Sequence, residues 1–328
     1  MVDRRRQLLA ALSDGDFHSG QSLADIADIS RAAIWKQLKV LEAQGIQIEA
    51  VSGKGYRLQE PLQLLDEQSI SAHLSESIRN NLNNLEVLFE TLSTNQYLLQ
   101  QLSENPSSIH ARVVLAEFQS MGRGRGENNW LSAPASGLCL SLGWRFNSMP
   151  ATLTALPLAV GVVLAQCLRQ AGYDAVNLKW PNDLVVNGAK LGGILIESRS
   201  QIAGACDIVL GVGININLPQ SLRQHIDKEV TDLNSLTSGK LDRNQLAAAI
   251  IGALIRLLQD FPEQGFTGYR EAWQNLDSGR GKQAILLHPT GKSSGTIIDV
   301  DENGLLIMSV NGEQQKYSSG ELSIRIIN

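Results

Sequence analysis

One stretch of twelve residues, 119–130, constrains this chain more than any other. It reads QSMGRGRGENNW and follows the apolar residues 113–118, which predict a short buried strand. Three glycines within five residues let the main chain approach a ligand closely, with its N–H groups turned inward. Arg123 and Arg125 lie between these glycines and carry planar guanidinium groups suited to phosphate or carboxylate. The stretch therefore predicts an anion-binding loop, with an ordinary surface loop as the alternative.

The length and charge of the chain limit its class. Its 328 residues can fold into about two or three domains, each with a core of its own. The net charge of −5 excludes a general polycation, so any contact with nucleic acid must come from a local patch. Cys139, Cys167 and Cys206 stand singly in apolar surroundings. They predict buried, reduced thiols rather than disulfides or a zinc site.

No segment of the sequence points to a membrane. The amino terminus is charged from Asp3 to Arg6, which argues against a secretory signal. Residues 151–168 lack charge, but they include Pro157 and Gln166 and lie at the lower limit of a membrane span. They predict a buried core helix. We therefore expect a soluble, cytoplasmic protein without a membrane partner.

Residues 1–63 are expected to form a small amino-terminal domain. Helices are predicted over residues 4–12, 21–27 and 31–44, and the second should bury Leu23, Ile26 and Ala27. The residues that follow predict a β-hairpin, with strands over 46–51 and 56–58. Three short helices followed by a hairpin are typical of a winged helix-turn-helix.

The third helix is the predicted DNA-reading element, because Ile34, Leu38 and Leu41 form a buried stripe and leave the other side outward. Residues 1–60 hold eight basic and eight acidic residues, which argues for weak binding by a monomer. The alternative is a helical protein-interaction module, but the acids gather at residues 14–28 and the cations on the third helix. The residues expected to contact DNA are Ser30, Arg31, Trp35, Lys36 and Lys39, with Lys54 and Arg57 in the wing.

Polar residues begin a helix in the central part of the chain. Residues 85–92 predict a strand, and Ser93, Thr94 and Asn95 cap a helix over residues 96–102. Their hydroxyl and carboxamide groups, beside free backbone N–H groups, can bind a neutral polar group or an anion, and plain capping is the alternative. Residues 137–146 alternate large apolar residues with small or polar ones, as expected for a half-buried strand.

Two further runs place polar residues beside buried strands. Lys179 and Lys190 flank a hairpin whose turn is Asn187-Gly188, and a lysine at the mouth of a buried strand is poor core design. Residues 207–218 predict a buried strand that contains Asn215. An asparagine in an apolar run requires hydrogen-bond partners, which are a ligand, a metal-bound water or the fold itself. Both runs therefore suggest a polar site.

The carboxyl-terminal residues predict a core helix and then a small β domain. Residues 243–261 have the apolar period of a helix. The short strands expected after it are residues 283–287, 296–300, 305–310 and 322–326, separated by turns at 289–291, 301–304 and 311–312.

Five of these runs occur in the order and spacing found in bacterial biotin protein ligases. They are residues 93–96, 122–125, 179–184, 190–197 and 211–215. With the amino-terminal module included, the whole chain resembles the bifunctional biotin ligases that also act as biotin-operon repressors.

The resemblance implies an α+β multidomain protein. The winged helix-turn-helix would occupy residues 1–63, and a mixed-sheet α/β catalytic domain related to class II aminoacyl-tRNA synthetases would occupy residues 64–276. An SH3-like β-barrel would follow over residues 277–328. ATP with Mg²⁺ would activate biotin to biotinyl-5′-AMP, and biotin would pass to a specific lysine of the biotin carboxyl carrier protein of acetyl-CoA carboxylase. The adenylate-bound homodimer, formed through edge strands of the central sheet, would bind operator DNA of biotin biosynthesis genes.

The implied reaction gives expected roles to single residues. The expected catalytic residues are Arg123, Arg125, Lys190 and Asp183; the role of Asp183 in orienting the acceptor lysine, and those of Lys179 and Asn215 toward phosphate and metal, are hypotheses. The positions that match biotin contacts are Ser93, Thr94, Asn95, Gln119, Arg123, Gly124, Arg125 and Lys190. The residues assigned to ATP and its phosphates are Arg125, Trp130, Lys179 and Asn215, and Asn215 is also the candidate ligand for Mg²⁺.

The chain departs from the family pattern at three places. Repressor-type members usually continue Arg-Gly-Arg before the loop tryptophan, whereas residues 126–128 read Gly-Glu-Asn. This removes two cations and adds a carboxylate beside the expected phosphate site, which works against tight retention of the adenylate. No tryptophan lies in residues 218–236, where the adenine-covering loop is expected. Trp35 occupies a base-facing position where the best-known relatives carry a smaller polar residue.

Two other functions fit the same residues. A lipoate or other acyl-protein ligase could use the same scaffold, because the fold alone does not fix the acid. A ligand-responsive repressor without catalysis would fit the altered arginine loop.

Overall fold

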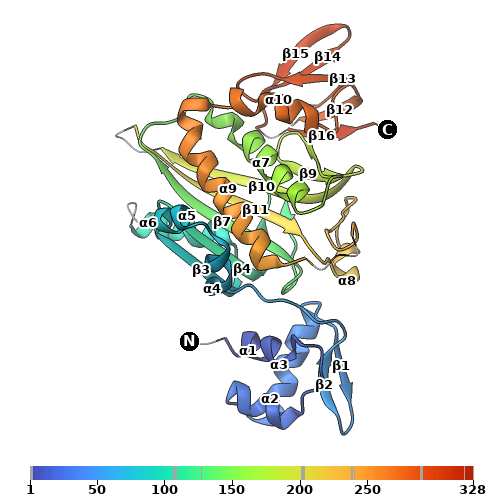
Figure 1. The fold of residues 1–328 in the computed structure, drawn as a ribbon. Coiled ribbons are helices and arrows are strands. Elements are labelled where there is room, and N and C mark those ends of the chain that lie inside the picture. The colour runs from blue at the N-terminus through green and yellow to red at the C-terminus, as the bar shows by residue number, and fades with distance from the viewer. Residues whose placement is uncertain are drawn as a thin grey trace.

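The computed structural model describes the chain except residues 1, 2, 106–108, 127, 201–203, 238, 240, 289, 290, 321 and 328. An amino-terminal helical module lies at one end, a central part is built on a large mixed sheet, and a carboxyl-terminal sheet lies at the other end (Figure 1). Two predicted features, Glu127 and the turn residues 289 and 290, therefore lie outside the described residues.

The amino-terminal module contains α1 (Arg4–Leu12), α2 (Gly20–Ala27) and α3 (Arg31–Ala43), followed by the antiparallel pair β1 (Ile48–Val51) and β2 (Gly55–Leu58). Serine side chains cap the second and third helices, since Ser19 accepts from the N–H of Ser22 and Ser30 from that of Ala33. The prediction for Ile26 was wrong, because this side chain is 44% exposed. Ala24 completes the buried face instead, whose centre lies near Ala27.

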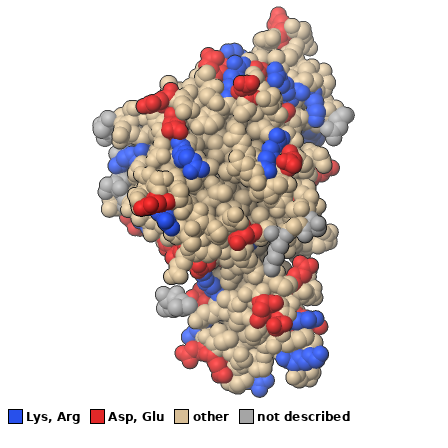
Figure 2. All heavy atoms as spheres, in the orientation of Figure 1, with Lys and Arg blue, Asp and Glu red and all other residues tan. Residues whose placement is uncertain are grey.

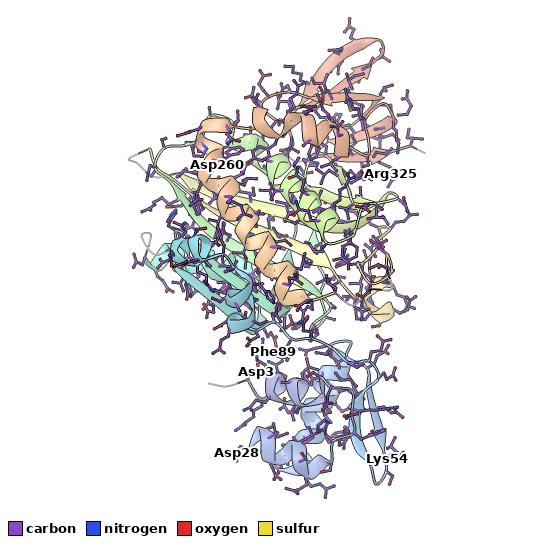
Figure 3. The ribbon with its side chains drawn as sticks, in the orientation of Figure 1. Asp3, Asp28, Lys54, Phe89, Asp260 and Arg325 are labelled. Carbon is purple, nitrogen blue, oxygen red and sulfur yellow. The ribbon has the colours of Figure 1, made fainter. Side chains whose placement is uncertain are left out.

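The surface of this module carries both signs of charge. Acidic and basic side chains are intermixed on the face drawn in Figure 2. In the wing, Arg57 was expected to face phosphate, but its Nε donates to Glu49 Oε2 at 2.7 Å. Lys54 is exposed at the tip of the wing (Figure 3).

One residue of the central part belongs to the core of the amino-terminal module. Phe89 lies on the strand β3 (Asn84–Thr91) and packs with Leu8, Leu12 and Leu38. The Arg5 guanidinium lies 5.2 Å from the centre of its ring, and Figure 3 places Phe89 at the junction of the two parts. The amino-terminal module is therefore packed directly onto the central sheet.

The central sheet has seven strands in the order β3-β4-β7-β11-β10-β9-β8, and only the β3–β4 pair is parallel. Its other strands are β4 (Arg112–Gln119), β7 (Gly137–Phe146), β8 (Asn177–Lys179), β9 (Asp183–Val186), β10 (Ala189–Ser200) and β11 (Cys206–Asn215). The predicted strand over residues 207–218 thus ends three residues early, at Asn215.

Helices cover both faces of this sheet. The main core lies between the sheet and α7 (Leu156–Gln170) and α9 (Arg243–Gln264), and α6 (Thr94–Glu104) packs on the other face with a smaller core. The remaining elements are α4 (Glu67–His73), α5 (Glu76–Asn81), η2 (Leu153–Ala155), α8 (Gln220–Arg223) and α10 (Thr267–Leu276). The sheet is thus the middle layer of a sandwich (Figure 1).

This double cover corrects the prediction of a half-buried strand over residues 137–146. Leu140 and Trp144 face the main core, while Ser141 and Gly143 face the other side and are equally buried. Ser141 lies beneath the start of α6, and a Cβ at Gly143 would contact Ile109. The alternation of residue size therefore reports two different buried faces, not one face in water.

Two helices are long and apolar enough to cross a membrane by length and composition alone. They are Leu153–Gln170 and Arg243–Gln264, and 61% of each apolar window is buried inside the protein. Both line the main core, so they serve as core helices in this fold.

The carboxyl-terminal sheet is antiparallel, with five strands in the order β15-β14-β13-β12-β16. Its strands are β12 (Gln283–His288), β13 (Gly291–Val300), β14 (Leu306–Val310), β15 (Glu313–Tyr317) and β16 (Ser323–Ile326). The sequence prediction missed β15, whose residues EQQKY carry no alternating apolar pattern. It is an exposed edge strand that pairs with β14. Because its side chains are almost all exposed, they need not alternate between apolar and polar residues.

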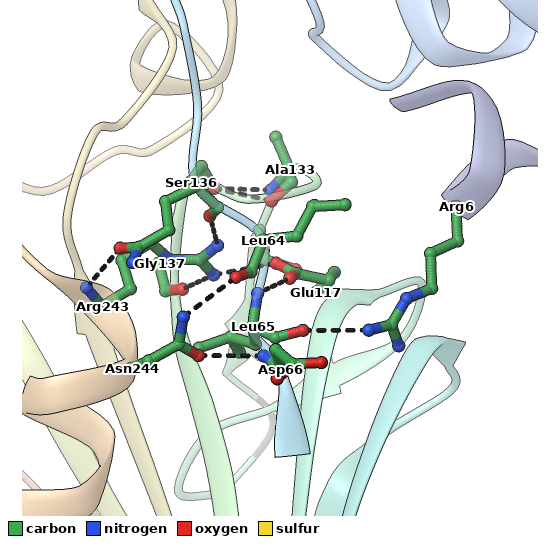
Figure 4. Close-up of polar contacts among 12 residues, drawn as sticks. Arg6, Leu64, Leu65, Asp66, Glu117, Ala133, Ser136, Gly137, Arg243 and Asn244 are labelled. Carbon is green, nitrogen blue, oxygen red and sulfur yellow. Dashed lines mark hydrogen bonds and ion pairs between the residues drawn. The ribbon is translucent and has the colours of Figure 1, made fainter. Parts of the chain in front are cut away.

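The chain between β2 and α4 is held by a buried polar network (Figure 4). Arg243, at the start of α9, is 4% exposed. It donates to Glu117 Oε2 at 2.9 Å, to the Gly137 carbonyl at 2.7 Å and to the Gln63 carbonyl at 2.5 Å. The N–H of Leu65 donates to the same carboxylate of Glu117. The linker is therefore fixed to the strands that carry the polar site.

Candidate active site

A buried hydrogen-bond network joins the start of α6 to β4 and β7. Gln119 Oε1 accepts from the N–H of Thr94 at 2.7 Å and from its hydroxyl at 3.1 Å. The Ser141 hydroxyl lies 2.7 Å from Thr94 Oγ1 and 2.6 Å from Asn95 Oδ1. Ser93, Thr94 and Asn95 are each 3% exposed, and Ser93 caps the helix through the N–H of Gln96. This network forms the floor of a polar site.

Two glycines of β11 make room for that floor. A Cβ at Gly211 would contact Asn95, and a Cβ at Gly213 would lie 2.6 Å from the Trp130 ring. Side chains at these positions would therefore expel the asparagine or the tryptophan. The glycine-rich part of β11 thus sets the depth of the site on the α6 side of the sheet.

The glycine–arginine loop, which follows β4 and includes Arg123 and Arg125, folds as a small hairpin over this floor. Gly122–Arg123 (β5) pairs with Asn129–Trp130 (β6), and a Cβ at Gly122 would collide with the Trp130 carbonyl. The N–H of Gly124 donates to the carbonyl of Asn128 at 2.7 Å. Gly122 is therefore required by the contact of the loop with its own backbone, and Gly126 by its positive φ of 63°.

Arg123 and Asn95 meet at one carboxylate. Arg123 Nη2 lies 2.9 Å from Glu197 Oε1, and Asn95 Nδ2 donates to Glu197 Oε2 at 2.9 Å. The Arg123 side chain is 46% exposed, so the guanidinium can exchange this partner for an anionic ligand.

Arg125 points to the carboxyl-terminal sheet. Its guanidinium donates to the carbonyls of Ser319 at 2.5 Å and Gly320 at 3.2 Å, and also to that of Leu322. Burial lowers the pKa of Arg125, while Asp183 raises it. Arg125 therefore lies between the two parts of the chain, within the electrostatic reach of Asp183.

Lys190 and Asp183 form an ion pair at the bulged hairpin of β9 and β10. Lys190 Nζ lies 2.6 Å from Asp183 Oδ1 and 6.0 Å from the centre of the Trp130 ring. The turn between the strands has positive φ at Asn187 (51°) and Gly188 (85°), as a two-residue hairpin requires. The register shifts between Lys190 and Gly192, and this bulge re-aims the lysine.

Lys179 lies in a positive part of the site. Burial lowers its pKa, Asp183 raises it, and Lys228, Lys190 and Arg325 lower it again. These cations come from four separate segments, including β16. Their convergence makes this end of the site attractive to a polyanion.

The segment of residues 218–236 is tied to the site through its backbone. Lys190 exchanges hydrogen bonds with it, from its N–H to the Glu229 carbonyl at 2.8 Å and from the Thr231 N–H to its own carbonyl at 2.9 Å. Asn215 Nδ2 donates to the Thr231 carbonyl at 3.1 Å. Asn215 thus has a structural partner, and its proposed role toward phosphate or metal stays a prediction.

The sequence analysis missed two residues of the site, Ser141 and Glu197. The sequence contained a signal for each of them, because Ser141 and Glu197 are polar residues inside otherwise apolar strands. Their role required knowledge of the register, which brings Ser141 opposite Gly211 and places Glu197 opposite Val209. No group of three or more His, Cys, Asp or Glu residues suited to a metal ion occurs within the described part of the chain.

The residues predicted to contact DNA share one outward side. Arg31, Trp35, Lys36 and Lys39 are exposed on α3, and Trp35 is 55% exposed. Lys39 also pairs with Glu42 at 2.5 Å, and Ser30 is the N-cap of this helix. The helix therefore presents an aromatic ring between cations.

Comparison with known proteins identifies the class of protein to which this chain belongs. Residues 89–215 match the biotin/lipoate A/B protein ligase family, and residues 4–57 match an HTH domain. The biotin protein ligase from Aquifex aeolicus in complex with biotin and ATP is similar in structure, with a TM-score of 0.62 and 26% identity over 75% of this chain and 100% of that chain. These matches give the chain the fold of a biotin or lipoate protein ligase joined to an HTH domain.

Two bacterial relatives are similar over nearly the whole chain. The bifunctional ligase/repressor BirA of Salmonella typhimurium is 36% identical over 322 residues, which cover 97% of this chain and 96% of that protein. The protein of the same name from Escherichia coli is 35% identical over 323 residues, with the same two coverages. The chain belongs to this family of bifunctional ligase/repressors. The family and the α+β fold class predicted from sequence are thereby confirmed.

Proposed function

We propose that this protein is an ATP-dependent biotin–protein ligase that also represses transcription. One observation carries the proposal: Arg123 shares Glu197 with Asn95 of the buried polar floor, and Lys190 lies 6.0 Å from the Trp130 ring that covers Gly213 on the same side of the sheet. The floor suits a neutral heterocycle that both donates and accepts hydrogen bonds, and the cations suit a carboxylate and a phosphate. Cytoplasmic location is part of this proposal, because the acceptor protein and operator DNA are found there.

The first half-reaction joins two anions. A biotin carboxylate oxygen attacks the α-phosphorus of ATP, the bond to the bridging oxygen breaks, and pyrophosphate leaves with the electron pair. Fixed positive charge lowers this barrier more than a proton shuttle does. Arg123 and Lys190 would change partners from Glu197 and Asp183 to the substrates, with Arg125 and Lys179 acting on the phosphates. These roles follow from position and charge.

Mg²⁺ fits this site through the nucleotide. The described residues contain no cluster of carboxylates for a metal ion, and Asp183 is paired with Lys190. Mg²⁺ commonly binds through substrate phosphates with one or two protein ligands, which suits such a site. Asn215 remains the proposed protein ligand.

The second half-reaction transfers biotin to a lysine of the biotin carboxyl carrier protein. The neutral amine attacks the acyl carbon, the bond to the phosphate oxygen breaks, and AMP leaves. An ordinary lysine has a pKa of about 10.4, so its ammonium must lose a proton. Its proton passes to water, and once Lys190 binds the adenylate, Asp183 is free to orient the lysine.

Replacing Asp183 by alanine is expected to spare adenylate formation and slow the transfer by about a hundredfold, as when a reacting group is held about 1 Å out of place. Pyrophosphate release and incorporation of labelled biotin into a carrier domain measure the two steps separately. Normal transfer by this variant would refute the role of Asp183.

Replacing Gly213 by alanine is expected to displace the Trp130 ring, because the new Cβ would lie 2.6 Å from it. Overpacking of this kind costs about 1–3 kcal/mol, so biotin binding should weaken by about a factor of ten. Isothermal titration with biotin measures the change. Gly268→Ala is a matched control, since the nearest atom to its added Cβ is the flexible tip of Gln264. Equal biotin affinities for the two variants would contradict this view of the site.

The repressor role rests on the winged helix and on a free sheet edge. Beyond Ile194, the described residues of β10 pair with β11 and leave the other edge open. We propose that the adenylate-bound protein forms a homodimer along this edge and then binds a two-half-site operator of biotin biosynthesis genes. Sedimentation with and without biotinyl-5′-AMP tests the dimer, and a monomer in both conditions would rule it out.

A lipoate-type ligase and a repressor without catalysis are the competing functions. The first would adenylate lipoate or octanoate and leave biotin unchanged. The second would bind DNA in response to biotin without releasing pyrophosphate. Parallel assays with the three acids, each with MgATP, separate the three functions.

A further inference from the structure

Two loops meet at the phosphate end of the candidate site. Lys228 Nζ, in the segment of residues 218–236, lies 3.4 Å from Asn128 Oδ1 in the glycine–arginine loop. The backbone near Lys228 is fixed, because the neighbouring Glu229 carbonyl accepts from the N–H of Lys190 at 2.8 Å. Lys228 is therefore held beside Lys190 and reaches across to the facing loop.

Positive charge is in excess at this place. Lys228, Lys190 and Arg325 all act on Lys179, and Asp183 is the acid that acts on it in return. Asp183 is already paired with Lys190. Lys228 lies between the exposed Asp227 and Glu229, but within the described ranges it forms no ion pair, and its ammonium contacts the neutral Asn128. Around Lys179 the cations outnumber Asp183, the one acid that acts on it, and a bound polyphosphate would balance them.

The facing loop supplies little positive charge of its own at this point. Gly126 and Asn128 are neutral, Glu127 lies outside the described residues, and Arg125 donates to carbonyls of the segment that precedes β16. Lys228 is thus the cation that the structure places against this part of the loop. Its exposed ammonium can leave a neutral amide for a phosphate oxygen at little cost, because the contact with Asn128 is long and solvated.

We propose that Lys228 is a further substrate-binding residue, which binds the phosphate groups of the nucleotide from the segment of residues 218–236, with Asn128 positioning it in the free protein. The proposal rests on the proposed ligase function and adds a residue to its phosphate site. A phosphate contact from Lys228 would also help this chain to hold an adenylate, although its glycine–arginine loop carries fewer cations than the loop of repressor-type relatives.

The test is the Lys228→Gln variant, assayed by biotin-dependent pyrophosphate release over a range of MgATP. We expect the KM for MgATP to rise about tenfold, as for the loss of one charged hydrogen bond, with the KM for biotin unchanged. Biotinyl-5′-AMP should also dissociate about tenfold faster in a filter-binding chase. Arg256→Gln, at an exposed position of α9 on the sheet face opposite α6, removes one positive charge away from the site and should match the unaltered protein.

A second variant tests whether a cation on the facing loop can replace Lys228. In Lys228→Gln, the further change Asn128→Arg places a cation on the other side of the same contact, so it should restore the KM for MgATP to within about threefold of the original value. An unchanged KM for MgATP in Lys228→Gln, with the unaltered protein active, would overturn the role of Lys228. Inactivity of the unaltered protein would instead count against the proposed ligase function.

Discussion

Replacing Lys190 by alanine is expected to lower the rate of biotin-dependent pyrophosphate release by a factor of about 10²–10³, the usual effect of removing one fixed charge-stabilising group. Lys190 lies 2.6 Å from Asp183 and 6.0 Å from the Trp130 ring, at a bulge that aims it across the site. It is the described cation best placed to act on both the biotin carboxylate and the α-phosphate. Its loss would also leave Asp183 without its cation beside a developing anion.

The Asp183→Ala variant is the matched control for this prediction. It removes the other half of the same ion pair, and we expect adenylate formation to survive in it. Loss of pyrophosphate release in both variants would indicate that the pair acts as a structural unit. Near-normal release by the Lys190→Ala protein would show that the charge for the first half-reaction comes from elsewhere.

Replacing Arg243 by alanine is expected to lower the free energy of unfolding by about 3–5 kcal/mol, the range found when one partner of a buried ion pair is removed. Arg243 is 4% exposed and Glu117 is 1% exposed, so the remaining carboxylate would be buried without its cation. The carbonyls of Gln63 and Gly137 would lose the same donor. Urea unfolding followed by far-ultraviolet circular dichroism measures the change.

Two further variants define the origin of that effect. Arg57→Ala breaks an exposed pair with Glu49, in which the side chains are 41% and 38% exposed, and should change stability by less than about 1 kcal/mol. A double variant, Glu117→Met with Arg243→Met, removes both buried charges and should recover part of the loss. An Arg243→Ala protein as stable as the original would contradict the importance of the buried ion pair between Arg243 and Glu117.

The buried pair of Arg243 and Glu117 also connects the winged helix to the candidate ligand site. Glu117 precedes Gln119 by two residues on β4, and Gln119 accepts from Thr94 in the floor of the site. The same Glu117 accepts from the linker N–H of Leu65. The winged helix is therefore joined to the ligand site through one strand and a few buried polar contacts.

The features predicted well from sequence are those set by local chemistry. The apolar period predicted the bounds of α1, and the Ser30 cap with the apolar period predicted those of α3, to within one residue, because these signals are local to each helix. The Asn187-Gly188 turn was predicted for the same reason, since both positions require positive φ. The exposure of Ile26 and the strand β15 were missed, because they depend on packing partners.

Most residues of the candidate site could be predicted from the sequence, but the contacts between them could not. Thr94, Gln119 and Lys190 stood out as polar groups beside buried strands. The engagement of Arg125 with Ser319 and Gly320 joins residues nearly two hundred positions apart, and no local pattern reports it. The contact of Lys228 with Asn128 likewise exists only once two loops are placed face to face.

Release of pyrophosphate from MgATP, measured with biotin and with lipoate in parallel, tests the ligase function most directly. We expect release with biotin alone, since the compact polar floor of Thr94, Asn95 and Gln119 suits a ureido ring that donates and accepts hydrogen bonds. Release with lipoate but not with biotin would assign the fold to another acid. No release with either acid, from a protein that still binds biotin, would contradict catalysis and leave a ligand-responsive repressor.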